Sequence, residues 1–297
     1  MNYKSIKALI VALLCLGSLK GYSNEIDSIK TIKQLNKFLF EKVDKNLNSD
    51  VRIRESALLP SNFDPYKFDP TAENENVFFK LDIDGNGLND LLVCGDVLLV
   101  ITDDSTKYNV HYIDKGMLLQ GGSKLVNIAF DNYRYLLVIN RFDEANLKTK
   151  TLLGEKDSLV FLFGGLIEYN ASPDKLEVDS IIFSTSYCPL GSCPVFELRI
   201  GHNADVRYDA IADNDKKGVY QSKLNAVSVN RLVNTINYLK IMSLKERYAV
   251  PWTDDQTVKL EVKFTNGKLK KISDYGLSGT WGLSTLYRQL YDLRKEL

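Results

Sequence analysis

The stretch from Leu81 to Val93 reads L-D-I-D-G-N-G-L-N-D-L-L-V and decides how the first half of the chain folds. Its two ends are apolar, and its middle is a run of acids, asparagines and glycines. Apolar residues on both sides of a short glycine-containing polar segment are typical of two strands joined by a loop. We therefore expect a β-loop-β unit whose acidic side chains gather in the loop.

The oxygen-bearing groups of this loop have a spacing that suits a hard cation. Calcium takes roughly six to eight oxygen ligands, and calcium loops supply them from the first, third, fifth, seventh and ninth positions, with glycine at the sixth. The sequence places Gly87 at that sixth position, and the ligand positions hold Asp82, Asp84, Asn86, Leu88 through its backbone carbonyl, and Asp90. The pattern predicts one structural calcium ion. The alternative is an ion-free turn in which these residues serve only the backbone.

Residues 82–90 match the pattern D-x-D-x-N-G-x-x-D, which resembles the calcium loops of the FG-GAP, or integrin β-propeller, type. Phe78-Phe79 and Leu91-Leu92 favour strands on both sides, and Val93 stands where an EF-hand has its bidentate glutamate. The resemblance implies a structural ion that clamps a β turn. Catalysis by the loop is not expected, because the ion would be coordinatively filled. The sequence has no second copy of the motif, as a full propeller would.

The first residues have the order of a secretory signal peptide. Lys4 and Lys7 precede an apolar run from Ala8 to Leu16, and small and polar residues follow up to Ser23. We expect cleavage near Ser23, export to the periplasm or the extracellular space, and a mature chain without a transmembrane segment. The alternative is a lipoprotein anchored through Cys15.

The charge balance of the mature chain argues against nucleic acid as a partner. The full chain has 38 basic and 38 acidic residues, and removal of residues 1–23 takes away three lysines and no acid, leaving 35 against 38. Phosphate binding needs a concentrated basic surface. The short cluster of Lys268, Lys270 and Lys271 is interpreted as a solvated face of a strand. We expect the partner to be a protein or a glycan of the cell envelope.

The chain is predicted to be α+β, with a β-rich domain over 24–170 and an α+β domain over 171–297. The first domain begins with a helix over 26–43, continues through a Pro-containing loop over 46–76, and then has mostly antiparallel strands at 77–81, 90–102, 108–113, 125–130, 133–140 and 159–168. The second has strands at 180–185, 195–200 and 206–209, a helix over 227–242, a hairpin of 258–264 with 269–272, and a helix over 283–297. The boundary falls at the N-A-S-P-D segment, residues 170–174.

Three cysteines remain after the predicted cleavage. Cys188 and Cys193 lie five positions apart around a Pro-Leu-Gly-Ser segment, and in an exported protein a disulfide is the expected outcome. A redox-active pair is the alternative, although no C-x-x-C motif occurs. Cys94 is left without a partner. Only His111 and His202 occur in the chain, and neither has zinc-ligand spacing to the cysteines.

Residues 180–297 resemble an uncharacterised family of exported bacterial domains, common in Bacteroidetes, with a C-x-G-x-C-P-x-[YF] signature. Cys188, Gly191, Cys193, Pro194 and Phe196 carry the match, with one extra residue between the cysteines and Phe in place of the commoner Tyr. The family has no assigned activity. The resemblance therefore implies export and a domain boundary, but no reaction.

We expect a non-catalytic protein that binds a component of the envelope and carries one structural calcium ion. The alternative is an envelope enzyme. A thiol oxidoreductase would use Cys188 and Cys193, and a polymer hydrolase would use Asp254 and Asp255, which follow Trp252. A capped turn explains these two acids as well, because adjacent side chains point apart. No G-x-S-x-G motif supports a serine hydrolase.

Overall fold

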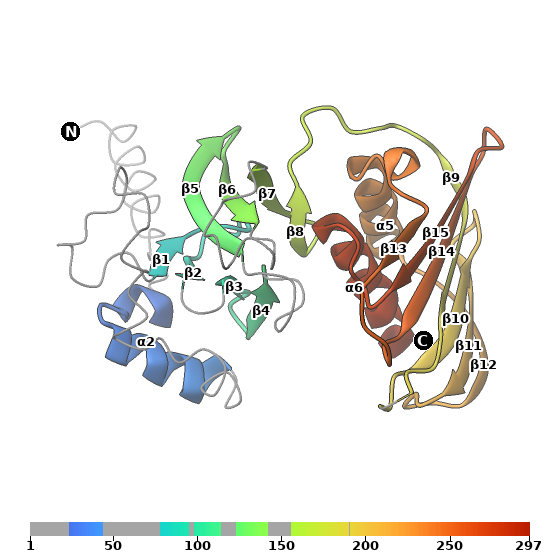
Figure 1. Cartoon of the computed structure of the whole chain (residues 1–297), viewed down its shortest axis with the longest axis horizontal. Helices are drawn as coiled ribbons and strands as arrows, with labels where there is room; N and C mark the ends of the chain where they lie inside the picture. Colours follow the sequence, from blue (N-terminus) through green and yellow to red (C-terminus); the bar gives the residue numbers. More distant parts are fainter. Residues whose placement is uncertain (1–23, 44–77, 95–97, 114–122, 142–155, 190) are drawn as a thin grey trace, which may run out of the picture. The chain divides into compact units, whose positions relative to one another are not determined.

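The computed structural model of the chain describes residues 24–43, 78–94, 98–113, 123–141, 156–189 and 191–297 (Figure 1). The expected signal peptide, Cys15 and the Pro-containing stretch lie outside the described residues. The described part is mostly β, with antiparallel sheets and a few helices. It contains no helix that is long and apolar enough to cross a membrane.

The chain divides into two compact units, one formed by residues 1–96 with 100–110 and the other by 97–99 with 111–297. Leu136, Val160 and Ile167, which precede residue 170, belong to the same hydrophobic core as the strands and helices that follow it. A compact unit is not by itself an independently folding domain, so the domain boundary at residues 170/171 stays a prediction.

The first unit opens with helical segments, where one continuous helix over 26–43 was expected. The segments are η1 (Glu25–Ser28), α2 (Ile32–Phe38) and the π-helical η2 (Leu39–Val43). The break lies at Thr31, whose side chain caps α2 by accepting the Gln34 N–H, while the Gln34 side chain accepts the Thr31 N–H. This reciprocal capping box favours a new helix start over continuation of the first one.

A four-stranded sheet follows, in the order β1-β2-β3-β4. Its strands are β1 (Phe78–Leu81), β2 (Asp90–Cys94), β3 (Leu98–Asp103) and β4 (Tyr108–Tyr112). The single strand expected over 90–102 is two strands. The central residues of β2 and β3 have no exposed surface, namely Leu91, Leu92 and Val93 in β2 and Leu99, Val100 and Ile101 in β3. Strands covered on both faces have continuous apolar runs, which hides the boundary between them.

The second unit contains a sheet in the order β5-β6-β7-β8. Its antiparallel strands are β5 (Ser123–Asp131), β6 (Arg134–Arg141), β7 (Lys156–Leu162) and β8 (Gly165–Glu168). The single strand expected over 159–168 is a hairpin, because Phe163 and Gly164 adopt positive φ values of 56° and 87°. Positive φ at both central residues defines the tight turn that suits two twisted antiparallel strands.

A seven-stranded sheet forms the rest of the second unit, in the order β12-β11-β10-β9-β14-β15-β13. Its strands are β9 (Val178–Thr185), β10 (Val195–Ile200), β11 (Asp205–Ala212), β12 (Gly218–Lys223), β13 (Arg247–Ala249), β14 (Thr257–Phe264) and β15 (Leu269–Tyr275). Only the pairing of β13 with β15 is parallel. The sequence did not predict β12 and β13, which form the two edges and lack a regular burial pattern.

Helices α5 (Ala226–Tyr238) and α6 (Trp281–Glu296) cover one face of this sheet, with the short η4 (Ile241–Ser243) after α5 (Figure 1). Phe183 of β9 stacks on Tyr287 of α6, with ring centroids 5.7 Å apart. The Glu168 carboxylate accepts the N–H groups of Trp281 and Gly282 at 2.7 and 3.0 Å. These N–H groups begin α6 and have no partner within the helix, so Glu168 satisfies them and complements the helix dipole.

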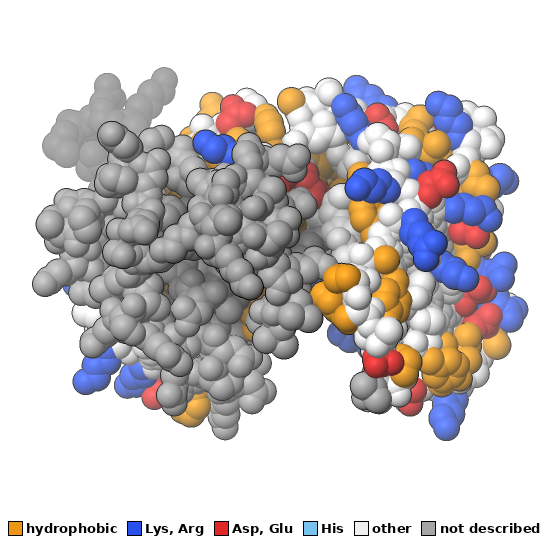
Figure 2. Space-filling view, in the orientation of Figure 1, with side chains coloured by type: hydrophobic (Ala, Val, Ile, Leu, Met, Phe, Trp, Pro, Cys, Tyr) orange, Lys and Arg blue, Asp and Glu red, His pale blue; other side chains and the backbone are white. Residues whose placement is uncertain are grey.

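The other face of the seven-stranded sheet is charged. Figure 2 shows basic and acidic side chains intermingled over this part of the molecule. Four ion pairs occur on these strands, namely Arg199–Glu197, Arg207–Asp209, Lys263–Asp179 and Lys271–Glu261. Exposed ion pairs of this kind contribute little to the free energy of unfolding. They therefore indicate that this face of the sheet is solvated.

One lysine of the expected solvated cluster is buried. Lys270 is 6% exposed, and its ammonium group donates to the Leu244 carbonyl just after η4. Neighbouring residues of a strand point to opposite faces, so Lys271 is solvated and Lys270 points to the core side. The interpretation of the whole cluster as solvated was therefore wrong for Lys270.

Candidate functional site

The acidic loop connects β1 to β2 in the first unit. Leu81 pairs with Asp90, so residues 82–89 make the connection. Gly85 and Gly87 have φ values of 79° and 88°, and a Cβ at either position would meet nothing within 4 Å. Backbone conformation, not lack of space, therefore favours glycine at both positions.

The Asp82 carboxylate stabilises the loop by accepting hydrogen bonds from backbone N–H groups of other loop residues. Its Oδ1 accepts the Gly85 N–H at 2.9 Å, and its Oδ2 accepts the Gly87 N–H at 3.1 Å. Asn86 acts in the same way, because its Oδ1 accepts the Leu88 N–H at 2.7 Å. These bonds curl the chain around the side-chain oxygens and fix the direction in which the Asp82 carboxylate points.

Asp90 is fully buried and ties the loop to the sheet. Its Oδ2 accepts the N–H groups of Ile83 and Asp84, and its Oδ1 accepts the Asp103 N–H. Carboxylate oxygens of Asp82, Asp84 and Asp90 all lie within 4.8 Å of one another. Among the described residues, these acids are the one group of three or more potential metal ligands that comes this close.

Burial and nearby negative charges disfavour ionisation of Asp84 and Asp90. Burial raises the pKa of Asp90 to about 7, and the nearby negative charge of Asp84 adds to the rise. The pKa of Asp84 is also raised, first by burial and then by the charges of Asp82, Asp103 and Asp104. Like charges at such distances destabilise one another, and a cation among them would reverse that effect.

Asp103 also belongs to this site, although the calcium-loop pattern does not include it. Its N–H binds Asp90, and its carbonyl accepts the Asn86 Nδ2–H at 2.6 Å. It lies at the end of β3, outside the sequence motif of the loop. Long-range strand pairing brings it to the loop, and no local spacing could reveal that. Coordination of a metal by Asp82, Asp84, Asn86, Leu88 and Asp90 stays a prediction.

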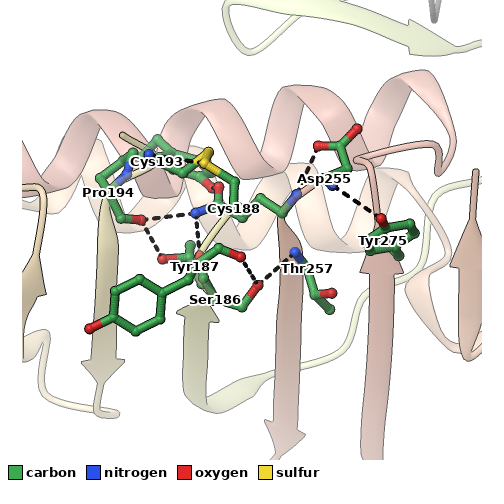
Figure 3. Close-up of a disulfide and its surroundings, with 11 residues drawn as sticks. Ser186, Tyr187, Cys188, Cys193, Pro194, Asp255, Thr257 and Tyr275 are labelled. Carbon is green, nitrogen blue, oxygen red and sulfur yellow. Dashed lines mark hydrogen bonds between the residues drawn. A yellow bond between two sulfur atoms is a disulfide. The ribbon is translucent and has the colours of Figure 1, made fainter. Parts of the chain in front are cut away.

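The second candidate site is the cysteine pair between β9 and β10. The Sγ atoms of Cys188 and Cys193 lie 2.08 Å apart in a disulfide, with 5.7 Å between the Cα atoms (Figure 3). Buried Gln256 holds both sides of this segment, because its Nε2 donates to the carbonyls of Ser186 at 2.7 Å and Pro194 at 3.0 Å. The Tyr291 hydroxyl of α6 in turn donates to Gln256 Oε1. This network fixes the disulfide segment to the core.

Cys94, at the end of β2, is a free cysteine. Burial raises the pKa of its thiol to about 12. The thiolate is the reactive form of cysteine, so the raised pKa disfavours reaction of this thiol near neutral pH.

The two histidines have separate surroundings. His111 is buried on β4, where its Nδ1 contacts Arg288 Nη1 at 2.7 Å and its ring meets Phe161 edge to face. Burial and the Arg288 charge lower the pKa of His111 to about 3, so the ring is neutral and accepts the arginine hydrogen bond. His202 is exposed in the turn between β10 and β11. His111 thus has a packing role.

Asp254 and Asp255 build a turn before β14. The Asp255 carboxylate accepts the Trp252 indole N–H at 3.2 Å and the Gln256 N–H at 2.8 Å. Asp254 is exposed, has a φ of 71°, and accepts the Thr253 hydroxyl at 3.1 Å. The acids therefore bind neighbouring side chains and the Gln256 backbone within this turn, as a capped turn would require.

Residues 179–294 match the model of a family described as Domain of unknown function (DUF6438). The match covers the seven-stranded sheet, the disulfide segment, α5 and most of α6. No curated protein matches the chain. This C-terminal part is thus similar to a domain of unknown function, and the match names no activity for it.

Proposed function

We propose that this chain is an exported, non-catalytic binding protein of the bacterial envelope, whose acidic loop holds one structural calcium ion. The observation that carries the calcium part is the convergence of carboxylate oxygens from Asp82, Asp84 and Asp90 within 4.8 Å. Three carboxyl groups at that distance favour a bound cation over an empty turn, because a cation would stabilise their ionised forms.

The chemistry of the donors favours calcium among the common metals. The candidate ligands are carboxylate, amide and carbonyl oxygens, which suit hard cations, and no sulfur or imidazole ligand belongs to the set. Calcium accepts irregular oxygen cages, whereas magnesium demands a near-ideal octahedron and keeps several of its waters. The loop sites of extracellular proteins bind calcium with Kd values of about 10⁻⁴ to 10⁻³ M.

The ion would stabilise the sheet and would not act on a substrate. Asp90 joins the loop to β3 through Asp103, so a cation that holds Asp82 and Asp84 beside Asp90 would lock β1, β2 and β3 together. Such an ion binds only the folded chain, and its binding energy adds to the free energy of unfolding.

Export is supported by the disulfide and by the order of the first residues. Disulfides persist in oxidising compartments and are rare in the cytosol. Cys188 and Cys193 are bonded to each other in a segment that buried Gln256 holds in place. That arrangement favours a structural staple over a redox-active pair.

A binding role is favoured over the envelope-enzyme alternative by the roles that the candidate catalytic residues already have. Asp255 binds Trp252 and the Gln256 backbone, and the cysteines staple a strand connection. Neither set combines an activated nucleophile with a base that touches it, which is the requirement for covalent catalysis.

Thermal melting with added calcium tests the proposal. We expect 5 mM calcium to raise the Tm of the chelator-treated protein, because about ten times Kd stabilises by ~1.4 kcal/mol, and magnesium to have a smaller effect. The variant Asp82→Asn with Asp84→Asn should lose the calcium shift. Asp205→Asn, at an exposed position on β11, is the matched control and should keep it. Equal shifts in both variants would contradict the site.

A further inference from the structure

The turn between β5 and β6 has an unfavourable backbone conformation, and burial of its side chains does not offset the cost. Asp131 pairs with Arg134, so Asn132 and Tyr133 form a two-residue turn with φ values of 46° and 62°. This turn type favours Asn followed by Gly, because both residues have positive φ. For a side chain such as tyrosine the left-handed conformation costs about 1–2 kcal/mol.

The next hairpin of the same sheet provides an internal comparison. The β7–β8 turn consists of Phe163 and Gly164, with glycine at the position that corresponds to Tyr133. The Tyr133 side chain is 93% exposed, so burial of its ring does not offset the backbone cost. A tyrosine held in an unfavourable conformation and displayed to solvent points to a role outside the fold.

Further aromatic rings lie on this hairpin tip, which we define as residues 130–135. Phe130 is 62% exposed, and its ring centroid lies 5.1 Å from that of Tyr135, with the rings tilted by 59°. A phenylalanine side chain that stays in water lacks the roughly 2 kcal/mol of stabilisation that its full burial would contribute. The tip therefore presents exposed aromatic surface in the turn itself, at Tyr133, and at the adjoining end of β5, at Phe130.

Hydrogen-bonding groups accompany these rings. The Asp131 carboxylate accepts the Tyr169 hydroxyl at 2.7 Å and the Asn132 amide at 3.2 Å, and both bonds end on Oδ2. Asp131 Oδ1 and the side-chain oxygen of Asn132 can then accept hydrogen bonds from a ligand. Asp131 and Arg134 carry opposite charges, so the tip has no net charge.

We propose that the hairpin tip binds a polysaccharide, with the Tyr133 ring stacked on the apolar C–H face of a sugar and with Asp131 and Asn132 accepting its hydroxyl groups. Aromatic rings offer flat apolar surface, and the adjacent acceptors match the rim of a sugar ring. The absence of net positive charge disfavours nucleic acid and anionic lipid, both of which need basic residues. This inference rests on the proposed function only for export, which brings the chain to a polysaccharide.

Co-sedimentation with purified peptidoglycan sacculi and with cellulose tests the site, with vesicles of phosphatidylethanolamine and phosphatidylglycerol as the lipid arm. We expect the full chain to sediment with at least one polysaccharide and not with vesicles. Tyr133→Gly should weaken that binding at least tenfold while the Tm stays unchanged or rises, because glycine relieves the turn. Tyr187→Ala removes another exposed tyrosine, outside the tip, and should bind as the unchanged chain does.

Three outcomes would overturn the inference. They are sedimentation with vesicles only, sedimentation with none of the probes, and undiminished polysaccharide binding by Tyr133→Gly. The last result would place the polysaccharide site elsewhere on the chain and leave the proposed function intact. Calcium-dependent melting and cell fractionation, measured on the same protein, test the proposed function separately.

Discussion

Oδ1 of Asp90 accepts the backbone N–H of Asp103 at 2.9 Å, across 13 positions of sequence. This bond fixes the acidic loop to the end of β3. Asp90 is the first residue of β2 and, unlike Asp82 and Asp84, is fully buried. The residue is a structural anchor whether or not a cation is bound.

Asp90→Ala should therefore destabilise the fold in chelator and in calcium alike. The change removes the acceptor of three backbone N–H groups, two of them in the loop, and buried donors without a partner cost about 1–3 kcal/mol each. Urea unfolding should show a loss of at least ~2 kcal/mol, whereas Asp205→Ala should stay within ~0.5 kcal/mol of the unchanged chain. A loss that appears only with calcium would mean that Asp90 is a ligand and not an anchor.

Replacement of both Cys188 and Cys193 by alanine should lower the free energy of unfolding by about 2 kcal/mol, the chain-entropy effect of so short a loop. The Gln256 bonds to Ser186 and Pro194 should keep the segment in place. Thermal melting measures the loss, and Cys94→Ala is the control for removal of a thiol. A thiol oxidoreductase would reduce insulin and lose that activity in the double variant. We expect no insulin reduction by either protein.

His111 should make the fold sensitive to mild acid. Its folded pKa of about 3 lies below the ordinary value of 6.5, so the unfolded chain binds the proton more tightly. Stability is then fully present above pH 6.5 and falls as the pH drops toward 3, by up to about 1.4 kcal/mol per pH unit. Urea unfolding at pH 7, 6 and 5 should show a shallower dependence for His111→Asn than for the control His202→Asn. Identical slopes would contradict a neutral buried ring.

Gly282 lies against Leu239, and a Cβ at position 282 would come within 1.8 Å of Leu239 Cδ2. Alanine is usually better than glycine inside a helix by about 1 kcal/mol, yet here overpacking should win and Gly282→Ala should destabilise by about 2 kcal/mol. Combination with Leu239→Ala should cost less than the sum of the single changes, because the smaller side chain makes room. Stabilisation by Gly282→Ala would show that the helix end is loosely packed.

The sequence predicted the regular parts of the fold because their periodicity is local. Strand β10 lies at the residues expected, and α6 begins two residues before the predicted start. The helix starts at these two extra residues because Thr280 caps it by accepting the Leu283 N–H. Edge strands β12 and β13 escaped prediction because an edge strand can be exposed on both faces and then shows no alternation.

The acidic loop was selected from spacing alone, but its supports were not. Asp103 comes to it through strand pairing, and Gln256 reaches the disulfide segment from the residues just before β14. Glu168 caps α6 from more than a hundred residues away. Contacts of this kind depend on the packed structure, so no local sequence motif predicts them. The exposed Tyr133 depends on a backbone angle that the Asn-Tyr dipeptide does not reveal.

Calorimetric titration of the chelator-treated chain with calcium tests the central claim most directly. We expect one ion per chain, with a Kd of about 10⁻⁴ to 10⁻³ M, and loss of the binding heat in the Asp82→Asn, Asp84→Asn variant. Absence of binding heat at 10 mM calcium, together with an unchanged Tm, would contradict the calcium site and leave the loop as an ion-free turn.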